Sequence, residues 1–115
     1  MSVKLNREAI LAARKLSTKE VSVPEWGDAD SKVTIRELTA GEAQTLGAQA
    51  KENENDAMLL WVIAGVINDD GSRMFGDGDK DSLSQLGAGP ILRVGTAVVK
   101  LCGFAPDDTK QTEKN

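Results

Sequence analysis

The feature that most constrains this fold is an unbroken run of apolar residues near the middle of the chain. Residues 57–67 read AMLLWVIAGVI, without a single charged side chain. The length of the run favours a helix, although its β-branched residues leave a buried strand open. A helix that is apolar on almost every side lies at the centre of a core or is covered in part by a partner. The run is too short to cross a membrane, since a spanning helix needs about 20 apolar residues.

The chain that must surround this run has 115 residues, which is the size of one ordinary domain. We therefore expect a single domain over residues 1–104. The polar residues 105–115 are expected to form a disordered tail. Only 3% of the residues are aromatic, so the core has to consist mainly of aliphatic side chains.

Two segments before the apolar run alternate between apolar and polar residues, as half-buried strands do. They cover residues 19–24 and 32–38, and the stretch that joins them is rich in turn-forming residues. This pattern predicts an antiparallel hairpin. Upstream of it, an amphipathic helix is expected over residues 6–16, with Asn6 as its N-cap.

Helices are expected to cover the apolar face of the hairpin. Thr39 and Glu42 have the spacing of a capping box and predict a helix over residues 40–52. Further helices are expected over residues 56–67, 80–86 and 91–102. The expected fold class is α+β, mostly α, with an N-terminal helix, one antiparallel β-hairpin, and then three to four helices packed on it.

The residue types give no pattern for catalysis, metal binding or cofactor binding. The chain has no histidine and one cysteine, Cys102, which excludes a Ser–His–Asp triad and a zinc site, and we expect an inert buried thiol. Residues 77–81 resemble the start of a calcium loop, but its sixth and twelfth positions hold Ser82 and Ala88. We interpret these aspartates as helix caps. We therefore expect that the protein is not an enzyme and that it holds no metal or cofactor.

The acidic balance of the chain argues against nucleic acids and anionic membranes as partners. The net charge is −4, and the sequence has no basic block that could neutralise phosphates. A lone cysteine and an N-terminus without the apolar segment of a signal peptide lead us to expect a cytoplasmic location.

Binding to another protein is the function class that these exclusions leave. Large apolar and aromatic side chains anchor protein interfaces, so part of the apolar helix or the tryptophan of the hairpin loop could contact a partner. Core packing is the competing interpretation, and for Trp26 we favour an indole that locks the loop onto the core. The candidate partner-binding residues are Trp26, Met58, Leu59, Trp61 and Val62.

Several segments together resemble the tail assembly chaperones of long-tailed bacteriophages. The order and spacing of these segments agree over residues 10–104, and residues 41–55 match least, with fewer charged residues than the family pattern. Besides the apolar helix, the matching segments are residues 21–27 (VSVPEWG), 33–42 (VTIRELTAGE), 68–71 (NDDG), 75–79 (FGDGD) and 101–104 (LCGF).

The resemblance implies a concrete function. Chaperones of this family bind the tape measure protein, a long and largely helical chain, and keep it soluble until tail tube subunits polymerise around it. They are absent from the mature virion. The resemblance also implies self-association and a contact with the tail tube protein through a longer frameshift product. Residues 113–115 (EKN) can be encoded by GAA AAA AAC, which contains a slippery heptamer.

Other functions remain open at the level of sequence. A minor structural tail or head-joining protein of the virion would be found in purified particles, whereas a chaperone would not. A generic cytoplasmic adaptor would lack phage genes as neighbours. A small enzyme or ligand-binding module would require a deep pocket with a buried carboxylate.

Overall fold

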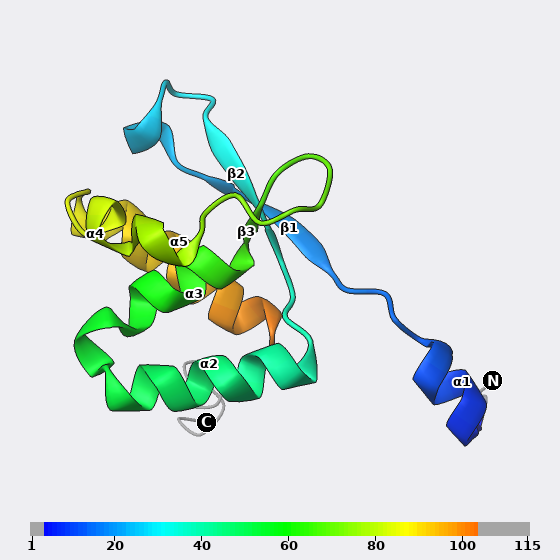
Figure 1. Ribbon diagram of the computed structural model, residues 1–115. Helices are drawn as coiled ribbons and strands as arrows, with labels where there is room; N and C mark the ends of the chain where they lie inside the picture. Colours follow the sequence, from blue (N-terminus) through cyan, green and yellow to red (C-terminus); the bar gives the residue numbers. More distant parts are fainter. Residues whose placement is uncertain (1–3, 104–115) are drawn as a thin grey trace, which may run out of the picture.

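A three-stranded antiparallel sheet forms one part of the structure, and helices pack against it (Figure 1). The computed structural model describes residues 4–103. The expected disordered tail over residues 105–115 and the frameshift-related residues 113–115 lie outside the described residues. The element order confirms the expected fold class, α+β and mostly α.

The expected hairpin is present. Strands β1 (Thr18–Ser22) and β2 (Lys32–Arg36) pair antiparallel, with Val21 opposite Val33. The alternating pattern places Ile35 and Val21 in the core, with exposed fractions of 0% and 8%. The connecting loop contains a single 3₁₀ turn, η1 (Pro24–Trp26).

Helix α2 (Ala40–Glu52) begins at the capping box that the sequence predicted. The Glu42 N–H donates to Oγ1 of Thr39 (3.1 Å), and the Thr39 N–H donates to Oε1 of Glu42 (2.9 Å). These two bonds satisfy backbone donors that the first turn of a helix leaves without partners. Leu46 is the one residue of α2 that is buried.

The apolar run divides into two elements. A 3₁₀ turn, η2 (Glu54–Asp56), leads into helix α3 (Ala57–Gly65), and β3 (Val66–Ile67) follows directly. The expected helix over residues 56–67 is therefore wrong at its end. After Gly65, the two β-branched residues Val66 and Ile67 adopt an extended conformation and pair with β2. The sheet therefore has a third strand beside the two strands of the hairpin.

A short helix and a long one complete the body. After a tight turn and a bridge between Ile67 and Arg73, η3 (Asp77–Asp79) leads into α4 (Lys80–Leu83), which is shorter than expected. Helix α5 (Ala88–Leu101) begins three residues earlier than expected. Within residues 4–103, no helix is long and apolar enough to span a membrane.

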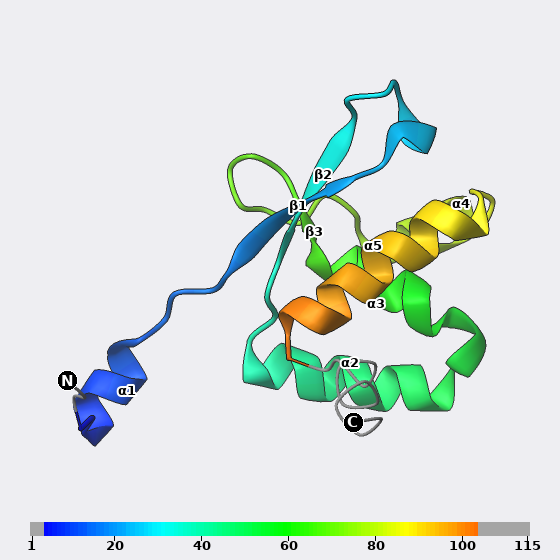
Figure 2. The ribbon, with the colours of Figure 1, turned by 180° about the vertical axis from the view of Figure 1, so that it is seen from behind.

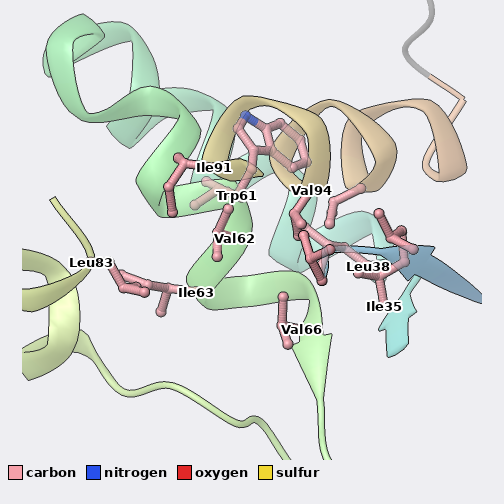
Figure 3. Close-up of a cluster of buried hydrophobic side chains, with 13 residues drawn as sticks. Ile35, Leu38, Trp61, Val62, Ile63, Val66, Leu83, Ile91 and Val94 are labelled. Carbon is pink, nitrogen blue, oxygen red and sulfur yellow. The ribbon is translucent and has the colours of Figure 1, made fainter. Parts of the chain in front are cut away.

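The core lies where α3, α5 and the sheet meet. Val62, Val66, Val94 and Ile35 are all fully enclosed and gather in one cluster (Figure 3). No polar or charged residue of the described chain is buried. The run that dominates the sequence is therefore largely core, in agreement with the core-packing interpretation of it.

Helix α1 (Arg7–Ala12) forms but does not pack on the body. Asn6 caps it as predicted, because Oδ1 of Asn6 accepts a hydrogen bond from the Ala9 N–H (2.9 Å). Figures 1 and 2 show α1 set apart from the other helices, and none of its residues is buried. The Cα radius of gyration is 15.9 Å, against about 13 Å for a compact chain of 100 residues. Helix α1 is also shorter than the helix that was expected over residues 6–16.

Candidate interaction surfaces

The five residues predicted to bind a partner lie at different depths. Val62 is fully enclosed, and Trp61 is 9% exposed. Met58 and Leu59 are half-buried on α3, and Trp26 is half-buried in the hairpin loop. Four of the five therefore share one helix, of which Met58 and Leu59 reach the surface. Their role in partner binding stays a prediction.

Trp26 contacts the core from the hairpin loop. Its ring packs against the cluster of buried side chains. Its indole Nε1 is enclosed and makes no hydrogen bond with any described residue. The ring therefore acts through packing, in agreement with an indole that holds the loop onto the core.

A shallow groove runs between β1 and α5, and we call it the β1–α5 groove. Its volume is about 620 Å³. Leu92 is its most exposed apolar side chain, at 51%. Three basic side chains and one acidic side chain line it, so its charge is positive. The lining residues are Lys19, Glu20, Val21, Ser22, Gly89, Leu92, Arg93, Thr96, Ala97 and Lys100.

Arg93 joins this groove to the hairpin loop. Its guanidinium donates two hydrogen bonds to the carboxylate of Glu25 (2.9 and 2.7 Å) and one to the carbonyl of Ser22 (3.2 Å). Hydrogen bonding by Arg93 lowers the pKa of Glu25 to about 2. The carboxylate therefore stays charged, and the loop remains tied to α5, over a wide pH range.

A second groove lies between α2 and α3, and we call it the α2–α3 groove. It consists of two adjoining hollows of about 570 and 360 Å³ that share Gln49, Leu60 and Asp77. Apolar side chains form its floor, and four carboxylates face two basic side chains along it. The lining residues are Gly41, Glu42, Thr45, Leu46, Gln49, Glu52, Asn53, Asp56, Leu60, Ile63, Ala64, Arg73, Asp77 and Lys80.

Three ion pairs occupy the sides of the α2–α3 groove. Their closest N–O distances are 2.8 Å (Arg36–Glu42), 3.0 Å (Lys80–Asp56) and 3.4 Å (Arg73–Asp77). Hydrogen bonding by Arg36 lowers the pKa of Glu42 to about 2. Glu52 forms no ion pair with a described residue, so its charge is free to meet a cation from outside.

The acidic run and the cysteine have structural contacts. The Gly76 N–H donates to Oδ2 of Asp79 (2.8 Å), which supports the interpretation of these aspartates as caps. Across residues 4–103, no group of three or more metal-binding side chains is present. Cys102 is half-buried rather than buried, and its Sγ accepts a hydrogen bond from the Leu38 N–H (3.3 Å).

Sequence reasoning missed the most exposed apolar side chains. Leu92 follows Ile91 directly and lies off the stripe of Ile91, Val94 and Val98, so the helical period of α5 could have identified it. The exposure of Ile10 and Leu11, 55% each, has no such signal, because their narrow apolar face could equally have packed on the sheet.

No protein-family model and no curated protein sequence matches this chain. Its structure is similar to that of the tail assembly chaperone of bacteriophage HK97, with a TM-score of 0.55 and 19% sequence identity. The similarity covers 83% of this chain and 88% of that chain. The resemblance drawn from the sequence segments is thereby confirmed at the level of the fold.

Proposed function

We propose that this chain, which shares the fold of the HK97 tail assembly chaperone, is itself a phage tail assembly chaperone that binds the tape measure protein. The observation that carries the proposal is the similarity of fold over 83% of the chain. The sequence segments that resemble the family support it independently, because that resemblance rests on the order and spacing of residues and not on the fold. In this role the chain keeps its client soluble until the tail tube has polymerised around it.

The physical character of the surface supports this role. A chaperone for a long helical client needs accessible apolar side chains that can cover apolar stripes of the client. A net charge of −4 helps to keep such a complex soluble. Six large apolar side chains have exposed fractions between 42% and 62%: Leu5, Ile10, Leu11, Met74, Leu86 and Leu92.

The β1–α5 groove is our proposed client surface. Leu92 offers an exposed apolar contact in its lining, and Lys19 and Lys100 contribute positive charge. A client helix with an apolar stripe and acidic flanks is complementary to this groove in both respects. Met58 and Leu59 remain further candidates for contact, whereas the buried Trp61 and Val62 support the core beneath them.

Co-expression with the tape measure protein tests the function and the surface together. We expect the wild-type chain to raise the soluble fraction of the client several-fold and to co-purify with it. Leu92→Asp should abolish most of this gain. Leu86→Asp is the matched control, since Leu86 is 43% exposed and lies outside both grooves.

The outcomes separate the function from the surface. A client that stays insoluble with the wild-type chain would contradict the proposed function. A client that is solubilised equally by both variants would contradict the β1–α5 groove as the client surface, while the function would stand.

The proposal extends to where the chain acts and what else it contacts. We propose that it works in the cytoplasm of the bacterial host, is absent from the mature virion, and contacts the tail tube protein through a longer frameshift product. The alternative is a minor structural protein of the tail or head. Mass spectrometry of purified particles separates the two, because a chaperone is absent from them.

A further inference from the structure

The N-terminal arm, which we define as residues 4–16, is joined to the body at a single point. At Ser17 the backbone N–H donates to Oε1 of Glu37 (3.1 Å), and the carbonyl accepts from the Glu37 N–H (2.7 Å). Before Ser17, every hydrogen bond and ion pair of the described arm stays within the arm. The arm is thus an extension without a docking surface of its own.

The arm carries an apolar face whose exposure to water is unfavourable. Leu5 and Ile10 stand just before the N-cap and at the fourth helical position, the two positions of a hydrophobic staple, and Leu11 is adjacent. Their exposed fractions are 62%, 55% and 55%. A six-residue helix is too short to be stable alone in water, so α1 needs a surface that covers this face.

Charge identifies the surface that fits. Residues 4–16 contain four basic residues and one acidic residue, whereas residues 17–103 contain eight basic and fourteen acidic residues. The β1–α5 groove is basic and would repel the arm. The α2–α3 groove has apolar side chains at Leu60 and Ala64, and of its four carboxylates Glu52 is the one without an ion pair to a described residue. It therefore complements the arm in polarity and in charge.

We propose that the N-terminal arm of one copy docks in the α2–α3 groove of a second copy. Arg7 stands four residues before Leu11, on the same side of α1, so the apolar face and a cation reach the groove together. Leu11 then covers Leu60, and Arg7 meets Glu52, which has no ion pair with another described residue.

The position of the arm favours a second copy over the chain's own groove. The arm leaves the body close to the start of α2, since Ser17 is bonded to Glu37 and α2 begins at Ala40. It nevertheless extends away from α2 in both views (Figures 1 and 2). The link of residues 13–16 spans at most about 14 Å, which leaves little chain for a reversal. Exchange of a short element between identical copies is a common route to assembly.

This inference goes beyond the proposed function and needs no client. Arm and groove are different surfaces, so two arrangements are possible. Two copies can each place their arm in the other's groove, or each copy in a row can place its arm in the groove of the next copy. Either form places several chains in a defined order.

Sedimentation velocity of the full chain over a concentration series tests the inference. We expect the wild-type mass to rise with concentration to at least that of a dimer, and the association to weaken at least tenfold in 0.5 M NaCl. Ile10→Asp with Leu11→Asp should remain monomeric with an unchanged thermal melt, because neither side chain contacts the body. Leu86→Asp is the matched control and should associate like the wild type.

Charge reversal distinguishes exchange between copies from docking within one chain. Arg7→Glu with Arg14→Glu reverses the arm, and Glu52→Lys with Asp77→Lys reverses the groove. Each double variant should be monomeric alone, and an equimolar mixture should associate, because each arm then meets a complementary groove. A wild-type chain that stays monomeric at all concentrations, a mixture that fails to associate, or unchanged association of the Ile10 and Leu11 variant would overturn the inference.

Discussion

Gly65 of α3 lies so close to Val98 of α5 that Gly65 could not carry a side chain without displacing its neighbour. A Cβ built at Gly65 would lie 2.6 Å from Cγ2 and 2.7 Å from Cγ1 of Val98. Gly95 approaches α3 in the same way, since a Cβ there would lie 2.6 Å from Sδ of Met58. Glycine on each helix therefore sets the separation of α3 and α5, on which the core depends.

The first prediction follows from this close approach. Gly65→Ala should lower the free energy of unfolding by about 1–3 kcal/mol, because the added methyl group overpacks a buried contact. Gly47→Ala is the matched control in α2, where nothing lies within 4 Å of the added Cβ. It should raise the free energy of unfolding by about 0.5–1 kcal/mol through helix propensity. Urea denaturation measures both, and equal stability of the two variants would contradict the packing argument.

The second prediction concerns pH and the Arg36–Glu42 pair. The pKa of Glu42 is about 2 in the folded chain, against 4.5 for an unpaired group. A lowered pKa means that the pair stabilises the fold above pH 4.5 and that this stabilisation is lost as the pH falls from 4.5 towards 2. Because Glu42 is 44% exposed, solvent screens the pair, and we expect a contribution of at most about 1 kcal/mol.

Urea unfolding of Glu42→Gln at pH 7 and at pH 2.5 checks this expectation. Glutamine keeps the capping interaction but not the charge, so the variant should be less stable than the wild type at pH 7, and most of this difference should be lost at pH 2.5. Glu52→Gln, which removes a carboxylate without an ion pair to a described residue, should show no such change. A difference that is as large at pH 2.5 as at pH 7 would assign the effect to capping rather than to charge.

The elements that the sequence predicts well are those whose causes are local. The hairpin follows from alternation within two short segments, and the start of α2 follows from the chemistry of Thr39 and Glu42. Neither depends on residues far away in the chain. Fold class could therefore be predicted from patterns that each span only a few residues.

The features that the sequence does not predict depend on distant partners. Val66 and Ile67 continue an apolar run, and they form a strand only because Thr34 and Ile35 lie beside them in space. Likewise, an apolar run with no polar side cannot indicate which of its residues face solvent. The approach of α5 decides this, and it encloses Val62 while leaving Met58 half-buried.

The third prediction separates packing from hydrogen bonding at Trp26. Because its enclosed Nε1 makes no hydrogen bond with a described residue, Trp26→Phe should keep the free energy of unfolding within about 1 kcal/mol of the wild type. Trp26→Ala removes most of the ring and should cost about 2 kcal/mol or more. Chemical denaturation of both variants tests this, and an equal loss in the two would show that the indole N–H is needed after all.

The fourth prediction concerns the contact between Glu25 and Arg93, which ties the hairpin loop to α5. Glu25→Gln removes the charge of the carboxylate, and because the pair is exposed, the thermal melt should stay unchanged within error. The 3₁₀ turn of the loop should loosen, since two short-range bonds close it, from Trp26 N–H to the Val23 carbonyl and from Gly27 N–H to the Pro24 carbonyl. Hydrogen exchange at these two amides should become several-fold faster, while exchange in α3 stays the same.

The control is Glu20→Gln, which breaks an exposed pair with Lys32 outside the loop and should leave the two amides unchanged. Unaltered exchange in Glu25→Gln would contradict the prediction. The packing of Trp26 and the hydrogen bond from Arg93 to the Ser22 carbonyl would then be sufficient to hold the turn without the charge of Glu25.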